Sequence, residues 1–255
     1  MEKGKDKIAV LIDGDNAQAK LLDQILEEIS KYGKATIRRI YGDWTTPQMN
    51  SWKESINQYS FSPIQKFSYT TGKNSTDSSL IIDAMDILHG KTVDGFCIVS
   101  SDSDYTGLAK RIREEGIFVM GIGEKKTPQA FVQSCEVFTF SENINPAFEE
   151  KELLKSDNNP DAQKKVIKKQ KVDPRFLKKA FNIASGEDDE VYISQVGLAL
   201  RKLDPTFDPR AFGFRNLTEM FKSLKQYEVI DNKKDGLNHP LIREKNNRTN
   251  IESDL

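Results

Sequence analysis

The apolar residues in the first half of the chain fall into short runs that alternate with longer mixed stretches. Six runs have the length and side chains of strands: IAVLI (8–12), ATIRRIY (35–41), PIQKFSY (63–69), GFCIVS (95–100), IFVMGIG (117–123) and VFTF (137–140). Four stretches between them space their apolar residues as helices do: 19–32, 49–59, 76–88 and 105–116. This repeated order predicts an α/β fold, a doubly wound parallel sheet with helices on both faces.

The second half of the chain has a different pattern. Three segments are expected to be helical: 175–185, 193–203 and 216–224. Two strand-like runs follow, YEVID (227–231) and LNHPLIR (237–243), around the turn-forming NKKDG. Asp173-Pro174 and Asp208-Pro209 each place a proline where a helix or turn can begin. Three helices and a terminal hairpin predict a winged-helix domain.

A polar segment separates the two patterns. It reads EEKELLKSDNNPDAQKKVIKKQKV, with an Asn-Asn-Pro break and a lysine-rich end, which is typical of a linker. The closing EKNNRTNIESDL has no periodicity. We therefore expect a first domain over 1–148, a linker over 149–171, a second domain over 172–243 and a disordered tail over 244–255.

Composition limits the functions and locations open to the chain. Its 255 residues are 37% apolar and 30% charged, and the net charge of −1 gives no overall attraction to nucleic acid or membrane. The apolar runs are far shorter than the ~20 residues of a membrane helix. Cys97 and Cys135 lie in strand-like segments and are expected to be buried thiols of a reducing compartment. The cytoplasm is therefore the expected location.

Acidic residues follow the expected strands at the edge of the sheet where ligands bind. Asp13 follows the first strand and Asp102 the fourth, and these strands can be neighbours where the strand order reverses. Asp77 opens the helix before the fourth strand, and Asp104 lies two residues beyond Asp102. With no histidine or cysteine among them, the four carboxylates form an oxygen-rich site that suits Mg²⁺ or Mn²⁺ rather than zinc.

The chemistry expected of such a site is phosphodiester hydrolysis. A divalent ion lowers the pKa of bound water and offsets charge on the leaving oxygen. Asn16 could hold a water or a phosphate oxygen, and Lys73, in the loop before Asp77, could meet a phosphate. Ser100 and Ser101 could donate hydrogen bonds to the carboxylates or the substrate.

Each acid also has an ordinary structural interpretation. Asp15 could form only a turn, and Asp104 could only cap the helix that follows. On the helix of Asp77, the 100° spacing of residues places Asp86 toward solvent and does not decide which way Asp83 faces. It is the convergence of the acids at one edge that favours a metal site.

Three stretches resemble the signature blocks of NYN domains, which belong to the PIN-like nuclease superfamily. They are IDGDN (12–16), GKNSTDSSLIIDA (72–84) and IVSSDSDYTGLAKRIREEG (98–116), and the resemblance covers about 6–142. It implies a PIN-like, Rossmannoid fold and metal-dependent RNA cleavage. It also implies metal-binding roles for four residues and a polar role beside them for Asn16; the four are Asp13, Asp77, Asp102 and Asp104.

The stretch YISQVGLALRKLDPTFDPRAFGFRNLTEMFKSL (192–224) resembles the OST-HTH or LOTUS domain. The resemblance spans about 172–243 and implies RNA binding and, in some members, protein partners. Basic side chains that could meet phosphates cluster along its second and third helices: Arg201, Lys202, Arg210, Arg215, Lys222 and Lys225. Phe207, Phe212 and Phe214 lie among them and could stack on bases, although core packing is favoured for the last two.

These features predict a metal-dependent ribonuclease with a metal-activated water, whose second domain binds RNA or a protein partner. The tandem of the two domains that the chain resembles implies a bacterial protein. Two alternatives stay open. One is a non-catalytic RNA-binding regulator. The other is a haloacid-dehalogenase-like phosphatase, since Asp13-Gly14-Asp15 resembles the D-x-D start of that class. The preference for RNA over DNA comes from the resemblance alone, and a homodimer is compatible with the sequence.

Overall fold

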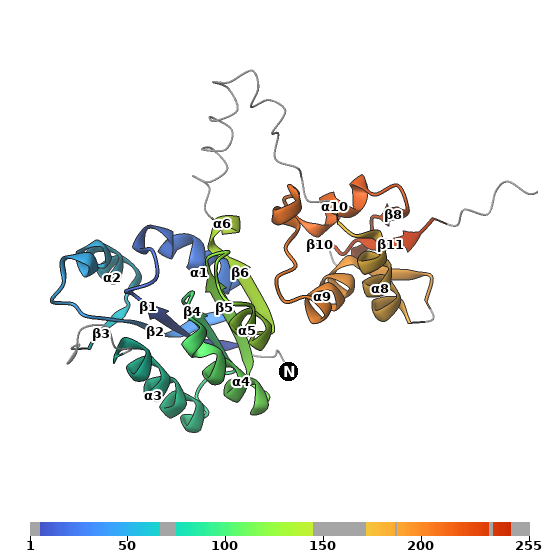
Figure 1. Cartoon of the computed structure of the whole chain (residues 1–255). Coiled ribbons are helices and arrows are strands. Elements are labelled where there is room, and N and C mark those ends of the chain that lie inside the picture. The colour runs from blue at the N-terminus through green and yellow to red at the C-terminus, as the bar shows by residue number, and fades with distance from the viewer. Residues whose placement is uncertain (1–5, 67–74, 145–171, 187, 235–236, 246–255) are drawn as a thin grey trace, which may run out of the picture. The chain divides into compact units, whose positions relative to one another are not determined.

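The computed structural model of the chain describes residues 6–66, 75–144, 172–186, 188–234 and 237–245 (Figure 1). The chain divides into two compact units, Met1–Lys164 and Lys165–Leu255. The predicted linker and the last ten residues of the predicted tail lie outside the described residues, so the domain boundaries stay predictions. Within the described ranges, no helix has both the length and the apolar character that crossing a bilayer requires.

The first unit is built on a six-stranded parallel sheet in the order β3-β2-β1-β4-β5-β6. The strands are β1 (Lys7–Asp13), β2 (Lys34–Gly42), β3 (Ser62–Gln65), β4 (Gly95–Val99), β5 (Phe118–Gly123) and β6 (Val137–Phe140). The order reverses between β1 and β4, which pair directly. This confirms the predicted doubly wound α/β fold.

Helices cover both faces of this sheet (Figure 1). The α-helices are α1 (Leu22–Ser30), α2 (Lys53–Tyr59), α3 (Ser75–Gly90), α4 (Thr106–Glu114), α5 (Gln129–Ser134) and α6 (Ser141–Ile144). Short 3₁₀ helices precede three of them: η1 (Ala19–Leu21), η2 (Pro47–Trp52) and η3 (Ser103–Tyr105). Two of the α-helices, α5 and α6, were not predicted, because their six and four residues are too few for a helical period to show.

Strand β1 shows how one apolar run serves two cores. Its alternate residues point to opposite faces of the sheet. Ala9 and Leu11 join the core that includes buried residues of α3, α4 and α5, and Val10 and Ile12 join the core that includes those of α1 and η2. Complete burial on both faces explains why the run contains no polar residue before Asp13.

Both cysteines of the first unit are buried, as predicted. Cys97 lies in β4 and Cys135 follows α5, and neither forms a disulfide. Burial raises the pKa of the Cys97 thiol far above its ordinary value and that of Cys135 to about 12. Both side chains are therefore neutral packing groups at ordinary pH rather than nucleophiles.

The second unit contains the three predicted helices and a small antiparallel sheet. The helices are α8 (Pro174–Ser185), α9 (Ile193–Leu203) and α10 (Leu217–Ser223), with the 3₁₀ helix η5 (Pro209–Phe212) between the last two. Asp173 caps α8 and Asp208 caps η5, each by accepting a hydrogen bond from the backbone two residues on. The two Asp-Pro pairs therefore start helices, as their sequence predicts.

The terminal strands of the second unit differ in detail from the prediction. A three-stranded sheet has the order β7-β11-β8, and a short ladder pairs β10 with β9. The strands are β7 (Glu190–Tyr192), β8 (Tyr227–Ile230), β9 (Lys233–Lys234), β10 (Leu237–Asn238) and β11 (Leu241–Glu244). The predicted strand over 237–243 is interrupted at Pro240, which has no N–H for a ladder. The three-residue strand β7 is too short to leave a pattern in the sequence.

Candidate active site

Asp13 occupies the buried carboxyl end of β1. Its side chain is completely buried, and the sheet pairs it with Tyr41 of β2 on one side. On the other side, the register of β1 with β4 brings Ser100 next to it. Oδ2 of Asp13 accepts hydrogen bonds of 2.8 Å from Nδ2 of Asn16 and from Oγ of Ser100. Such donors are what a buried carboxylate needs in place of water.

The serine that contacts Asp13 also contacts the second acidic strand end. Oγ of Ser100 accepts a hydrogen bond of 3.1 Å from the backbone N–H of Asp102. Oδ1 of Asp102 accepts one of 2.9 Å from the backbone N–H of Asp104 and so caps η3, the role that the sequence had left to Asp104. A chain of hydrogen bonds thus links the ends of β1 and β4, which meet at the strand reversal as predicted.

The turn after Asp13 is packed closely against β2. The backbone N–H of Gly14 donates to the carbonyl of Tyr41 at 2.8 Å, and its carbonyl accepts from Nε1 of Trp52 at 3.1 Å. A Cβ at Gly14 would lie 2.9 Å from the Tyr41 carbonyl oxygen. Only glycine fits there without displacing backbone, which accounts for the glycine in IDGDN.

The other residues predicted to bind metal are placed less completely. Asp77 lies in the first turn of α3, and its side chain, like the whole of Lys73, falls outside the described residues. Within the part of the chain that the structure describes, no group of three or more acidic, histidine or cysteine side chains could hold a metal ion. The metal-binding roles of Asp13, Asp77, Asp102 and Asp104 therefore stay predictions. The described side chains around β1 offer carboxylate, hydroxyl and amide oxygens, a donor set that fits Mg²⁺ or Mn²⁺.

A second carboxylate of α3, that of Asp83, faces the sheet. The helical spacing in the sequence did not decide its orientation. Asp83 accepts hydrogen bonds from Nη1 of Arg39 and from the hydroxyl of Tyr41, both on β2. Burial, and then the bond to Asp83, raises the pKa of Tyr41 far above its ordinary value, and Asp83 also raises the pKa of Arg39. Asp86 is exposed, as predicted. This cluster fixes α3, the helix that carries Asp77, against β2.

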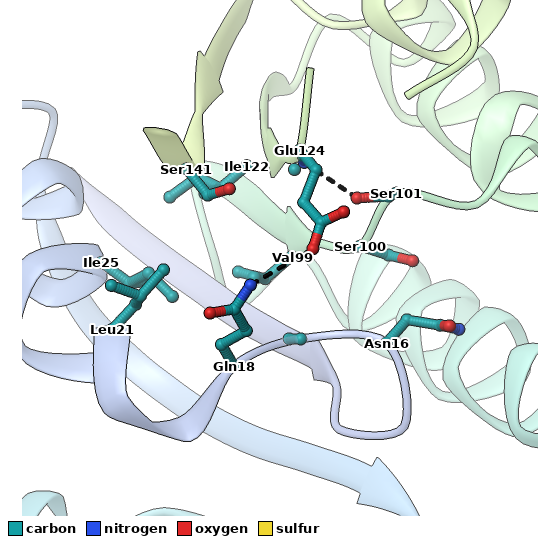
Figure 2. Close-up of a pocket in the computed structure, with 12 residues that line it drawn as sticks. Asn16, Gln18, Leu21, Ile25, Val99, Ser100, Ser101, Ile122, Glu124 and Ser141 are labelled. Carbon is teal, nitrogen blue, oxygen red and sulfur yellow. Dashed lines mark hydrogen bonds between the residues drawn. The ribbon is translucent and has the colours of Figure 1, made fainter. Parts of the chain in front are cut away.

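A small pocket opens beside these strand ends (Figure 2). Asn16, Ser100 and Ser101 line it from the loops after β1 and β4, with Glu124 from the loop after β5. Apolar side chains line it as well, among them Leu21, Ile25, Val99 and Ile122. Its cavity volume is about 20 Å³. Two of the predicted substrate contacts, Ser100 and Ser101, therefore lie together in one depression at the expected edge.

Glu124 is a candidate residue that the sequence reasoning missed. Its carboxylate accepts a hydrogen bond of 3.2 Å from Nε2 of Gln18 and lies 2.7 Å from Nζ of Lys126. Its backbone N–H donates to Oγ of Ser101 at 2.8 Å. The bond to Lys126 holds the pKa of the Glu124 carboxyl below its usual range. The available signal was its position directly after the fifth strand, the neighbour of β4.

In the second unit, the predicted basic residues differ in their surroundings. Lys202, Arg215 and Lys222 are exposed and Arg201 is half-buried. The guanidinium of Arg210 lies 3.0 and 2.7 Å from the two carboxylate oxygens of Asp208. Asp208 itself is buried, with an exposed fraction of 8%. This ion pair occupies the groups of Arg210 that would contact a phosphate.

The phenylalanines among these basic residues pack inward. Phe207 is buried and its ring contacts those of Phe176 and Phe212, with centroids 5.9 and 5.8 Å apart. Phe212 and Phe214 are partly buried against the same core. The core interpretation favoured for these two residues is confirmed.

Comparison with known proteins agrees with both resemblances. Residues 7–142 match the model of the NYN domain, and residues 162–239 match that of the OST-HTH/LOTUS domain, in the predicted order. An uncharacterized protein of Methanocaldococcus jannaschii is 28% identical over 131 residues, which are 48% of this chain and 49% of that protein. The chain thus spans about half the length of this curated relative. A crystal structure of a protein of unknown function from Vibrio parahaemolyticus covers 55% of this chain and 95% of its own, with 20% identity and a TM-score of 0.47.

Proposed function

Because the chain belongs to the NYN domain family of PIN-like nucleases and carries an OST-HTH/LOTUS domain, we propose that it is a divalent-metal-dependent ribonuclease. The observation that best supports this function is the meeting of two acidic strand ends at the strand reversal. Asp13 ends β1, Asp102 follows β4, and Ser100 forms hydrogen bonds with both. In open α/β sheets this is the position where ligands bind.

In this proposal Asp13 and Asp102 hold the metal ion from the two strand ends, and Asp77 and Asp104 complete the carboxylate set. A bound Mg²⁺ or Mn²⁺ would lower the pKa of a water and offset negative charge on the phosphate. The chain's own contribution is to orient the carboxylates. Hydrogen bonds from Asn16 and Ser100 fix Oδ2 of Asp13, so the buried side chain does not have to reorganise when the substrate binds.

The second unit would supply binding rather than chemistry. Exposed Lys202, Arg215 and Lys222 can meet the phosphates of an RNA, and each would release counterions as it does so. Because Arg210 is paired with Asp208, we propose that it stabilises the second unit and does not contact RNA. A protein partner of this unit, like a homodimer, would be an addition to RNA binding and not a requirement for cleavage.

Cleavage of a labelled single-stranded RNA in Mn²⁺, Mg²⁺ or EDTA tests the proposal, with Asp13→Asn and Asp102→Asn beside the wild type. We expect cutting that needs the metal and is lost in both variants while circular dichroism shows them folded. Asp86→Asn is the matched control, since it removes the same charge from the exposed side of α3. It should cut like the wild type.

The remaining outcomes decide between the alternatives. RNA that is bound and never cut, with both variants binding as the wild type does, would point to a non-catalytic RNA-binding regulator. Hydrolysis of a small phosphate monoester, with RNA left intact, would point to a phosphatase built on Asp13 and Asp15. Cutting that survives in Asp13→Asn would remove the carboxylate at the end of β1 from the mechanism.

A further inference from the structure

The pocket in Figure 2 shares two side chains with the surroundings of the Asp13 carboxylate. Asn16 and Ser100 line the pocket, and both donate to Oδ2 of Asp13 at 2.8 Å. A group bound in the pocket would therefore lie next to a phosphate held at the acidic strand ends. In an RNA chain, the group next to a phosphate is the sugar and base of one nucleotide.

The pocket is apolar on one side. Leu21 and Ile25 come from η1 and α1, Val99 from β4 and Ile122 from β5, and all four belong to the same hydrophobic core. Nucleobases have apolar faces and polar edges. An apolar wall with a few polar groups at fixed positions is the usual construction of a site for such a ring.

The polar side of the pocket is dominated by one carboxylate. Glu124 is positioned by the hydrogen bond of its backbone N–H to Ser101. The hydrogen bond from Lys126 lowers the pKa of the Glu124 carboxyl below its usual range. The carboxyl is therefore ionised at neutral pH and offers two acceptor oxygens. Gln18 reaches it from the loop after β1 and donates its amide N–H across the pocket (Figure 2).

We propose that this pocket binds a guanine base of the RNA and that Glu124 selects it, an inference that rests on the proposed ribonuclease function. Among the four RNA bases, guanine alone presents two adjacent N–H donors on its Watson–Crick edge, and these match the two oxygens of an ionised carboxylate. Adenine, cytosine and uracil each place an acceptor beside the donor, which a carboxylate repels. Glu124 is then a specificity-determining residue beside the cleavage site.

The present partners of Glu124 are ones that a base can replace. The side chain of Lys126 is 74% exposed, and an ion pair so exposed contributes only about 0–1 kcal/mol. Gln18 is also exposed, and its bond to Glu124 is 3.2 Å long. Because the Gln18 side chain crosses the pocket and is exposed, the proposal requires it to turn outward when a base binds.

Sequencing the cleavage products of a random single-stranded RNA tests this selection in the full chain. For the wild type we expect guanine enriched at one position next to the cut. Glu124→Gln should lower that enrichment about tenfold or more, since its amide offers one acceptor and one donor in place of two acceptors. Glu136→Gln is the control, since it makes the same change of charge just before β6, at the amino-terminal end of the strands and away from the pocket. It should leave the enrichment unchanged.

Calorimetric titration with guanosine and adenosine 5′-monophosphates tests the pocket without cleavage. We expect the wild type to bind the guanosine nucleotide about tenfold more tightly or better, and Glu124→Gln to bind both alike. Equal affinities in the wild type, or a guanine preference that Glu124→Gln retains, would overturn the inference. If the wild type cuts no RNA while Glu124→Gln abolishes a guanosine preference, the ribonuclease proposal fails and the guanine pocket stands.

Discussion

The hydroxyl of Ser100 donates a hydrogen bond of 2.8 Å to Oδ2 of Asp13, a completely buried carboxylate 87 positions earlier in the chain. The two residues meet because β1 and β4 are neighbours where the strand order reverses. The same hydroxyl accepts from the backbone N–H of Asp102 at 3.1 Å. One short side chain therefore holds the two acidic strand ends in a fixed relation before any ligand binds.

Removing this hydroxyl should destabilise the first unit. In Ser100→Ala the buried Asp13 carboxylate loses one of its donors, and we expect the free energy of unfolding to fall by about 1–3 kcal/mol. Urea denaturation measures this change. Ser51→Ala is the control, because among the described residues its exposed hydroxyl bonds only to the nearby carbonyl of Gln48, and it should cost less than about 0.5 kcal/mol. Equal costs in the two variants would mean that the bond to Asp13 contributes nothing.

Two glycine-to-alanine changes should have opposite effects on stability. At Gly14 a methyl group would lie 2.7 Å from Cε of Met49 and 2.9 Å from the carbonyl oxygen of Tyr41, so backbone must shift and we expect a loss of about 1–3 kcal/mol. At Gly107, in α4, a Cβ would meet no atom of the described residues within 4 Å. There alanine should gain about 0.5–1 kcal/mol through its higher helix propensity. Thermal unfolding of both variants gives the comparison, and a loss at Gly107 or none at Gly14 would contradict it.

Much of the fold was predictable because local patterns encode it. Residues 8–12 are apolar without interruption, as a strand covered on both faces must be, and the next residue is the first polar one. Alternation of strands and helices then implies parallel pairing and a strand reversal, which brings Asp13 toward Ser100 and Asp102. These steps need only periodicity and the topology that right-handed crossovers permit.

The residues that were not predictable depend on partners far away in the chain. Glu124 is defined by its contact with Gln18, 106 positions earlier, and no local pattern shows that contact. The spacing of Asp83 on α3 could not reveal that Arg39 and Tyr41 lie opposite on β2. Arg210 is a different case, because its partner Asp208 is only two positions away, and the sequence does not show that their side chains turn toward each other.

Stability should fall at alkaline pH in a way that depends on Tyr41. Its folded-state pKa lies far above the ordinary value of 10.0, so above about pH 10 the unfolded chain releases a proton that the folded protein keeps. The free energy of unfolding then decreases by about 1.4 kcal/mol for each pH unit. Tyr41→Phe removes this contribution. Urea titrations at about pH 9 and about pH 11 should therefore show a smaller decrease in the free energy of unfolding for this variant than for the wild type. Cys97 and Cys135 act in the same direction from their ordinary value of 9.0, but they do so equally in both proteins.

Arg210 and Lys222 should separate the stability of the second unit from its binding of RNA. Arg210→Ala leaves the mostly buried Asp208 without its bidentate partner, so we expect hydrogen exchange in α9 and α10 to report a loss of about 1–3 kcal/mol. Lys222 is exposed, and Lys222→Ala should leave exchange unchanged. It should instead weaken RNA binding and lower the slope of log affinity against log salt by about one. A lower salt slope for Arg210→Ala with no change in hydrogen exchange would contradict the stabilising role of Arg210. Its guanidinium would then bind a phosphate of the RNA and not Asp208.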